Sequence, residues 1–449
     1  MQSRKLLGVS ALILSAGLFT ACLDDDKGAG PVGGGEQNVG CLEADGTTLK
    51  LNITDDLCEL TTGTYALQGL TFVKFGSTLK LEPGVTVTGR TDGALAALIV
   101  EQGGILHAVG TASNPIVFTA ATASPVRGDF GGVALLGRSQ VNSPGNTNQL
   151  EGVHGVPYGG GLTGTIANDS SGHLQYVRIE YAGHEIAPDN ELNGLTMAGV
   201  GSGTKISHVH QYEGLDDCFE WFGGTVSASH LVASGCDDDI FDYDNGWQGT
   251  LQFIVGYHIG VTNADANGIE ADGLSSNHEA SPRTAGTIAN MTLIGNGTSS
   301  WNGMRLRRGI SGNIYNSIIT GFGGEGSPAN ASAIRVDDAV THRLVQNDSL
   351  KGHGIYAYGN ARRIHATGVT GDTLTASLAK INSWFTADST ASISLGLTRT
   401  NPKPATAPAG AVTLPTDKGF VAASYIGAFD PAASALWINE GTWVRKTNW

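Results

Sequence analysis

The sequence has little charge and almost no helical patterning. Only 15% of its 449 residues are charged, and 26 Lys and Arg are set against 41 Asp and Glu, for a formal net charge of −15. This acidic balance argues against binding nucleic acid, or an anionic membrane, through a basic surface, and it suits divalent cations. Apolar residues almost never recur at the spacing of a helix face, so a helical bundle is not expected.

Long hydrophobic runs are also missing, apart from one near the start of the chain. "LLGVSALILSAGLF", residues 6–19, follows Arg4 and Lys5. It is too short to cross a bilayer but has the length of a signal-peptide core. It ends in "FTAC", residues 19–22, which resembles the cleavage site of bacterial lipoproteins. We expect residues 1–21 to be a lipoprotein signal peptide and Cys22 to carry the lipid, with an ordinary secretory signal as the alternative.

The segment after this signal has almost nothing to bury. Residues 22–40 are polar and rich in glycine, which predicts a flexible tether. No later stretch is long and apolar enough to span a membrane. The sequence therefore predicts an exported lipoprotein at the outer membrane or cell surface of a Gram-negative bacterium, in contact with the membrane only through its lipid.

Familiar catalytic and metal motifs are absent. The sequence has no HExxH or CxxC zinc pattern, no credible GxSxG, P-loop or Rossmann fingerprint, and no EF-hand spacing. The cysteines other than Cys22 form an even set, which an oxidising compartment would pair in one of three ways. We expect Cys41–Cys58 and Cys218–Cys236, with free buried thiols as the alternative for the second pair.

Glycine and short strands dominate what is present. There are 65 glycines, about twice the average share. A short strand, a glycine turn and a second short strand recur, as in "STLKLEPGVTVTGR" (77–90) and in the blocks that begin at residues 174, 206, 228 and 251. Repeats of about 22 to 37 residues that cannot bury their own faces imply a solenoid, and strands imply a parallel β-helix.

We assign the β-helix to residues 61–385, which makes the chain an all-β protein. A β-propeller is the main alternative, but it needs blades of four antiparallel strands, and the hairpin turns are not seen. Because an open end would expose unpaired strand edges, residues 41–60 and 386–449 are expected to be the N-terminal and C-terminal caps.

The repeated blocks also carry a resemblance. "YVRIEYAG", "DDCFEWFGGT" and "DDDIFDYDNGW" resemble a group of bacterial surface lipoproteins with right-handed β-helices and no assigned activity. The fold resembles the pectin-lyase-like superfold. The resemblance implies a right-handed parallel β-helix at the cell surface and says little about activity.

Side-chain alternation sorts the second strand of each repeat into columns. Two columns are expected to face the core: Leu195, Phe219, Phe241, Ile269, Met304 and Ile334 in the first, and Met197, Trp221, Tyr243, Ala271, Leu306 and Val336 in the second. Two columns are expected to face solvent: Thr196, Glu220, Asp242, Glu270, Arg305 and Arg335 in the first, and Ala198, Phe222, Asp244, Asp272, Arg307 and Asp337 in the second.

The first outward column predicts an acidic ladder. Glu220, Asp242 and Glu270 should stack at one strand spacing, about 4.8 Å. Their repulsion calls for a cation, for the neighbouring arginines or for raised pKa values. The alternative is a solvated face with ordinary salt bridges. We take Glu220, Asp242, Glu270 and Arg305 as candidate catalytic residues, and Phe222, Asp244, Trp247, Asp272 and Arg307 as candidate substrate-binding residues.

A second acidic group lies in the turns before these strands. Asp216, Asp217, Asp237, Asp238 and Asp239 offer the oxygen ligands that Ca²⁺ prefers, so Ca²⁺ is the candidate cofactor. Turn aspartates that only bind backbone are the alternative. A further row, His208, His230, Asn290 and Asn316, is expected to be structural.

Two functions fit these patterns. The first is binding of a polysaccharide or envelope glycan through the acidic and aromatic ladder face. The second is a polysaccharide lyase or glycoside hydrolase on acidic glycans. Glu220 and Glu270, two coils apart, would lie about 9.6 Å from each other, in the range of inverting glycosidases. A lyase would use Ca²⁺ and Arg305 or Arg307.

Overall fold

The computed structural model describes residues 39–447, except 90–94, 162–163, 188–189, 264, 298–300, 324–330 and 391–393. The predicted signal peptide (1–21), the predicted lipidation site Cys22 and nearly all of the predicted tether (22–40) lie outside the described residues. Among the residues that are described, no helix has the length and apolar character needed to cross a membrane.

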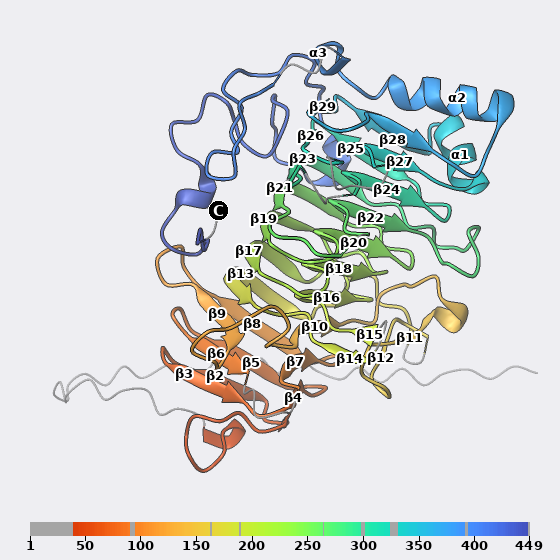
Figure 1. Cartoon of the computed structure of the whole chain (residues 1–449). Helices are drawn as coiled ribbons and strands as arrows, with labels where there is room; N and C mark the ends of the chain where they lie inside the picture. The colour runs from red at the N-terminus through yellow and green to blue at the C-terminus, as the bar shows by residue number, and fades with distance from the viewer. Residues whose placement is uncertain are drawn as a thin grey trace, which may run out of the picture. The chain divides into compact units, whose positions relative to one another are not determined.

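Strands from successive repeats stack beside one another in two long sheets (Figure 1). We call the 11-stranded one the ladder sheet. Its strands, in spatial order, are β1 (Asn52–Ile53), β4 (Leu70–Val73), β7 (Ala97–Val100), β10 (Gly132–Leu136), β16 (Leu195–Ala198), β18 (Phe219–Phe222), β20 (Phe241–Asp244), β22 (Ile269–Asp272), β24 (Met304–Arg307), β27 (Ile334–Val336) and β30 (Ile364–Ala366).

The second sheet has 15 strands, and we call it the bent sheet. Its main path is β2 (Leu57–Leu60), β5 (Thr78–Leu81), β8 (Ile105–Val109), β13 (Gly172–Glu180), β17 (Lys205–Tyr212), β19 (Ala228–Ser234), β21 (Thr250–Tyr257), β23 (Thr287–Ile294), β25 (Gly312–Tyr315) and β28 (Leu350–His353). The shorter β3 (Thr64–Leu67), β6 (Thr86–Gly89), β9 (Ile116–Ala120), β26 (Ile318–Thr320) and β29 (Tyr356–Tyr358) continue the same coils.

Pairing within both sheets is parallel, for example between β18 and β20 and between β21 and β23. Among the described strands, antiparallel pairing is confined to the hairpins β11 (Asn148–Gln149) with β12 (Pro157–Tyr158) and β14 (Glu185–Ala187) with β15 (Asn190–Glu191). The fold is therefore a parallel β-helix and not a propeller, as the sequence predicted.

Both predicted inward columns lie in the interior of the coils. Leu195, Phe219, Phe241, Ile269, Met304 and Ile334 are each 0% exposed. Neighbouring coils stack these rings, with the centroids of Phe219 and Phe241 5.6 Å apart. The described cysteines are joined as Cys41–Cys58 and Cys218–Cys236, which are the two pairings that we expected.

Each long strand of the bent sheet turns a corner at a residue with positive φ. These residues are Tyr176, His208, His230, Phe253 and Asn290, and Asn316 takes the same place between β25 and β26. The pairing register skips this position between successive strands. The side-chain amides of Asn290 and Asn316 donate to the carbonyl oxygens of Tyr425 (2.9 Å) and Val412 (2.8 Å). The row thus has the structural role that we expected, but it holds a distant part of the chain as well as the corner.

That distant part is the C-terminal strap, residues 394–447, which contains η3 (Thr416–Lys418) and η4 (Trp437–Asn439). The strap runs back along the bent sheet, in dark blue in Figure 1. Gln252 binds Val421 through both of its amide atoms. Farther along, the backbone N–H groups of Thr442 and Trp443 donate to the carbonyl of Ala112 at 2.7 and 3.1 Å.

The predicted C-terminal cap, residues 386–449, is therefore wrong for the strap, and only its first part, α3 (Ala387–Thr390), packs on the last coils. The last coils are packed by α1 (Ala339–Gln346), α2 (Gly371–Asn382) and α3, and α2 contacts both α1 and β30. α1 and α2 lie inside the predicted β-helix and α3 lies inside the predicted cap, whereas the strap lies along the flank of the β-helix. The N-terminal boundary also shifts: β1 and β2 lie inside the predicted cap (41–60) but already pair with β4 and β5.

Candidate functional site

The outer face of the ladder sheet has the register that the sequence predicted. Glu220 pairs with Asp242, Asp242 with Glu270, and Glu270 with Arg305. Arg305 pairs in turn with Arg335. Flanking core residues such as Phe219 and Trp221 are 0% exposed. The acids therefore stand one coil apart on the outside of the β-helix.

The expectation that this row faces open solvent is wrong. Glu220 is only 6% exposed and Asp272 only 4%, while Asp242, Asp244 and Glu270 are half-buried. The chain between β10 and β13 folds over this end of the ladder sheet and forms an apolar cluster on it, with Leu150, Val153 and Tyr158 packed against Ala198. Side-chain alternation correctly predicts that these residues lie on the outside of the coil, but the segment between β10 and β13 covers them.

Neither aromatic candidate is a surface for stacking sugar. Phe222 is 8% exposed and belongs to this covered cluster, with its ring centroid 6.1 Å from that of Tyr158. Trp247 is 0% exposed and turns into the core, where its centroid lies 5.5 Å from Trp221 and 5.1 Å from Tyr243. Its Nε1 donates to the carbonyl of Val226 at 3.0 Å. Both assignments to substrate binding are therefore wrong.

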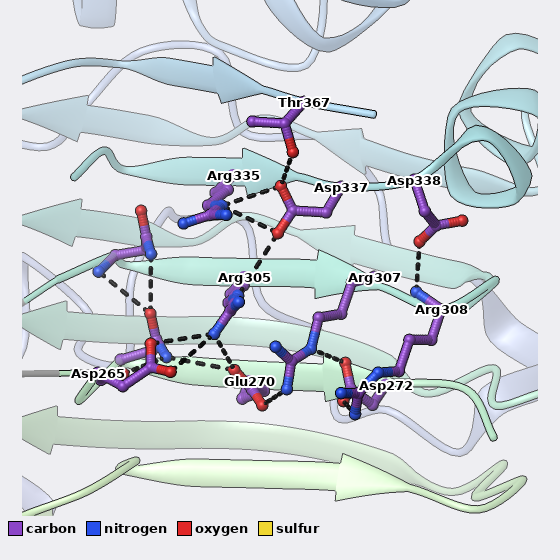
Figure 2. Close-up of polar contacts among 12 residues, drawn as sticks. Asp265, Glu270, Asp272, Arg305, Arg307, Arg308, Arg335, Asp337, Asp338 and Thr367 are labelled. Atoms are coloured by element: carbon purple, nitrogen blue, oxygen red, sulfur yellow. Dashed lines mark hydrogen bonds and ion pairs between the residues drawn. The ribbon is translucent and has the colours of Figure 1, made fainter. Parts of the chain in front are cut away.

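The acids of β22 are neutralised by arginines from the next coil. Arg305 lies 3.1 Å from Glu270, 3.0 Å from Asp265 and 3.5 Å from Asp337. Arg307 binds Asp272 at 2.6 Å and also binds Glu270, and Arg308 binds Asp272 (Figure 2). We call this network, made of Asp265, Glu270, Asp272, Asp337 and the three arginines, the paired half of the ladder.

In the paired half, burial and the neighbouring charges have opposing effects on the pKa values. Burial raises the pKa of Glu270 to about 7, Asp272 adds to the rise, and Arg307 and Arg305 oppose it. Burial works against the charged form of Arg307, yet Asp272 and Glu270 raise its pKa overall. Both arginines are thus held as cations among carboxylates.

Glu220, Asp242 and Asp244 form the unpaired half. Among the described residues, no Lys or Arg lies within ion-pair distance of any of the three. The side-chain amide of Asn193 donates to Glu220. One buried oxygen of Asp242 and one of Asp244 have no hydrogen-bond partner in the described part of the chain. Burial, and then the neighbouring carboxylates, raise the pKa of all three well above its usual range.

Sequence reasoning missed a polar ladder at the corner before the ladder sheet. Its members stand two residues before each core residue of the strand: Asn193, Asp217, Asp239, Asn267, Asn302 and Ser332. Asp217 accepts the backbone N–H of Asp239 at 2.9 Å, and Asp239 accepts that of Asn267. The amide of Asn302 donates to Asn267 at 2.9 Å. The offset of two residues is visible in the sequence, but the metal interpretation of the aspartates hides it.

The structure brings four of the five turn acids close to the ladder. Carboxylate oxygens lie within 4.8 Å of one another in three overlapping groups: Asp216, Asp217 and Asp238; Asp217, Glu220 and Asp242; and Asp239, Asp242 and Glu270. Asp237 stands apart, bound to Arg127 at 3.2 Å and to Thr262. Its assignment to the metal set is therefore wrong.

Trp301 is a further residue that the sequence did not reveal. The guanidinium carbons of Arg305 and Arg335 lie 5.0 and 5.1 Å from the centroid of its ring. Cations at this distance are attracted to an indole face. Trp301 therefore adds an apolar support to the paired half, on the side away from Glu220.

The geometry offers two kinds of chemistry. Overlapping carboxylate groups with buried, unpartnered oxygens can take a hard cation such as Ca²⁺. Carboxyl groups with raised pKa values can also share protons, as acid–base pairs do.

Comparison with protein families assigns the fold to a group. The family model for a pectate-lyase-like β-helix domain matches residues 51–398. Comparisons with curated proteins and with solved structures give no match. The parallel sheets and the matched span agree with a right-handed parallel β-helix, and the chain belongs to the pectate-lyase-like β-helix family.

Proposed function

We propose that the unpaired half of the ladder binds Ca²⁺ and, through it, an anionic polysaccharide of the cell envelope. The chain would act there as an exported, lipid-anchored binding protein. The observation that carries the proposal is the contrast between adjacent coils: β22 has arginines on its acids, whereas Glu220, Asp242 and Asp244 have none among the described residues.

The oxygen ligands support a calcium ion more than a zinc ion. Ca²⁺ takes six to eight oxygens, including carboxylates that bind through one or both atoms. Asp217, Glu220 and Asp242 already place oxygens within 4.8 Å of one another. A bound cation would supply the charge that the arginines supply one coil away, and its open positions would accept glycan carboxylates.

Lyase chemistry is less well supported than binding. Abstraction of a proton by Arg305 or Arg307 needs a neutral guanidine, but their carboxylate partners raise the pKa of both. Each guanidinium also contacts at least two carboxylates. These side chains are therefore held in place as charged structural partners.

Glycoside hydrolysis is the second candidate, and one distance favours the retaining mechanism over the inverting one. Oxygens of Glu220 and Asp242 lie within 4.8 Å of each other, near the spacing of about 5 Å between carboxyl groups that retaining enzymes use. The inverting pair that we expected, Glu220 with Glu270, is disfavoured because Glu270 is bound by two arginines. Glu220 is only 6% exposed, so it has little access to a glycosidic oxygen, whereas a cation could be reached from the half-buried Asp242 and Asp244, and binding is the better conclusion.

The test uses alginate and polygalacturonate as probes. Binding is measured in CaCl₂ and in NaCl of equal ionic strength, together with release of reducing ends and unsaturated products. We expect binding that needs Ca²⁺, no products, and loss of binding in Asp242→Asn with Asp244→Asn. Glu279→Gln is the control, since Glu279 is an exposed acid (50%) outside the ladder. Equal binding in both salts would refute the calcium role, and product release would favour the enzyme.

Export and lipid attachment need their own experiment. Changing Cys22 to Ala should move the protein from the membrane fraction to the soluble fraction of the periplasm. A wild-type protein that never enters the membrane fraction would refute the anchor without affecting the glycan proposal.

A further inference from the structure

A cavity of about 650 Å³ opens just beyond the carboxyl ends of β20 and β22. Two loops, residues 140–146 and 274–282, supply nearly all of its lining. Gly246 comes two residues after Asp244, and Leu274 comes two residues after Asp272. The cavity is therefore a direct continuation of the ladder face.

Both walls of the cavity are tied to the coil beneath them. The N–H of Asn142 donates to the carbonyl of Asn245 at 2.8 Å, and Asn146 accepts the N–H of Val141 at 2.7 Å. On the other wall, Arg283 binds the carbonyls of His278 and Gly309. A cavity with fixed walls is preformed, which is typical of small-molecule sites.

Gly246 lets the two loops approach the end of β20. A side-chain carbon at this position would lie 2.9 Å from the carbonyl oxygen of Pro282 and 3.2 Å from the N of Asn142. Its φ of +91° also disfavours any residue with a side chain. The cavity therefore depends on a glycine at the point where the ladder ends.

The lining is polar but uncharged. None of the described residues that form it is acidic or basic, in contrast to the ladder beside it. Asn142 and Ser143 are each 7% exposed, and Asn142 Oδ1 and Ser143 Oγ have no hydrogen-bond partner among the described residues. Pro144 and Pro282 add apolar surface. Amides and hydroxyls between flat apolar patches match the hydroxyls and C–H faces of a neutral sugar.

We propose that this cavity binds one or two uncharged sugar residues of the polysaccharide that the ladder holds. The inference rests on the glycan-binding function proposed above and narrows its ligand to a chain with both anionic and neutral residues. The volume falls within the range of about 300 to 1,000 Å³ that is usual for small-molecule pockets. The side chains of Ser276, Asn277 and Ser281, which line the cavity and are exposed, would exchange hydrogen bonds with sugar hydroxyls.

The test uses cellobiose, maltose and lactose as probes in calorimetric titrations of the full chain. Ser276→Trp puts a bulky ring into the cavity, and Ser275→Trp is its control: both serines are exposed, but only Ser276 lines the cavity. At least one disaccharide should bind wild type, with affinity about tenfold or more weaker in Ser276→Trp. Binding by Ser275→Trp and by Asp242→Asn should match wild type.

Two results would overturn the inference: no disaccharide bound by wild type, or unchanged binding in Ser276→Trp. Calcium-dependent binding of the anionic polysaccharides is measured on the same samples. If it persists without disaccharide binding, the cavity assignment fails and the ladder function stands. If disaccharides bind in the cavity and no anionic polysaccharide binds, the ladder function fails and the sugar site stands alone.

Discussion

The two halves of the ladder are built from the same kind of residue at the same position of successive coils, yet they are stabilised in different ways. In the paired half, Glu270 and Asp272 meet Arg305, Arg307 and Arg308 from neighbouring positions. In the unpaired half, Asp242 and Asp244 each keep a buried oxygen without a partner. A parallel β-helix repeats geometry from coil to coil, so the side chain on the next coil decides whether a carboxylate is structural or available.

The largest expected effect comes from breaking the paired half. Arg307→Met removes the cation that Glu270 and Asp272 share in a partly buried site. Because Arg305 still binds Glu270 and Arg308 still binds Asp272, we expect a cost of about 3 kcal/mol, the lower end of the range for breaking a buried ion pair. Denaturant unfolding should show this loss. Arg343→Met is the control: Arg343 and its partner Glu279 are 53% and 50% exposed, so the change should be below about 1 kcal/mol. Equal effects in the two variants would contradict the distinction.

The second prediction is that removing one carboxylate has opposite effects on the free energy of unfolding in the two halves. Asp272→Asn removes a carboxylate held by Arg307 and Arg308 and should lower the free energy of unfolding by about 2 kcal/mol. Asp242→Asn removes one of several repelling carboxylates and should raise it by about 1 kcal/mol at pH 8. Both are measured by urea unfolding without Ca²⁺. If both substitutions destabilised the protein, Asp242 would have a stabilising partner, and the distinction between the two halves would be wrong.

Calcium should reverse the stabilising effect of Asp242→Asn. A ligand that binds only the folded state stabilises it in proportion to the logarithm of its concentration above Kd. Added Ca²⁺ should therefore raise the melting temperature of wild type and do so less in Asp242→Asn, and matched NaCl should do neither.

The third prediction concerns pH. Burial raises the pKa of Glu151 and Glu270 to about 7 and that of Asp238 to about 6, above unfolded values of about 4. The folded state therefore holds extra protons, and its stability falls as pH rises through these values. His208 and His230 act the other way, since burial lowers the pKa of each to about 4. Their effect is complete by about pH 7, above their unfolded value of about 6.5.

Between pH 7 and 9 the carboxyl groups alone should thus control the slope. We expect a loss of about 1–2 kcal/mol, the equivalent of roughly one pKa unit. Thermal melts in Ca²⁺-free buffer measure it, and Asp242→Asn should flatten the slope. A stability that rises over this interval would show that the acids ionise without repulsion.

The register of the ladder could be predicted because alternation and repeat length fix which side chains share a face. Glu220, Asp242, Glu270 and Arg305 fall in one column in the sequence and pair in that order in the structure. What lies over the column could not be predicted. The burial of Phe222 comes from Tyr158, which belongs to an insertion outside the repeat, and no periodicity relates the two.

The same limit explains the other errors. Trp247 follows its strand directly, and only the path of the turn decides that its ring points to Trp221 in the core. The strap has no repeat of its own, so its course along the bent sheet depends on particular contacts, such as those of Gln252 and Asn316 and the backbone bonds to Ala112. Asp237 lies beside the ligand candidates in sequence, but Arg127 comes from another coil to bind it.

The smallest expected effect comes from replacing Trp301, an uncharged residue beside the paired half. Trp301 lies against Arg305 of the paired half and against the neighbouring Arg335, with both guanidinium carbons about 5 Å from its ring centroid. Such contacts are worth about 0.5–1 kcal/mol at partly exposed sites. Trp301→Leu keeps an apolar side chain there and should lower the free energy of unfolding by about 1 kcal/mol. The calcium-induced rise in melting temperature should be the same as in wild type, because that response belongs to the unpaired half. A variant that lost the calcium response would show that the arginine network and the cation site are one coupled unit, and that the two halves of the ladder cannot be treated separately.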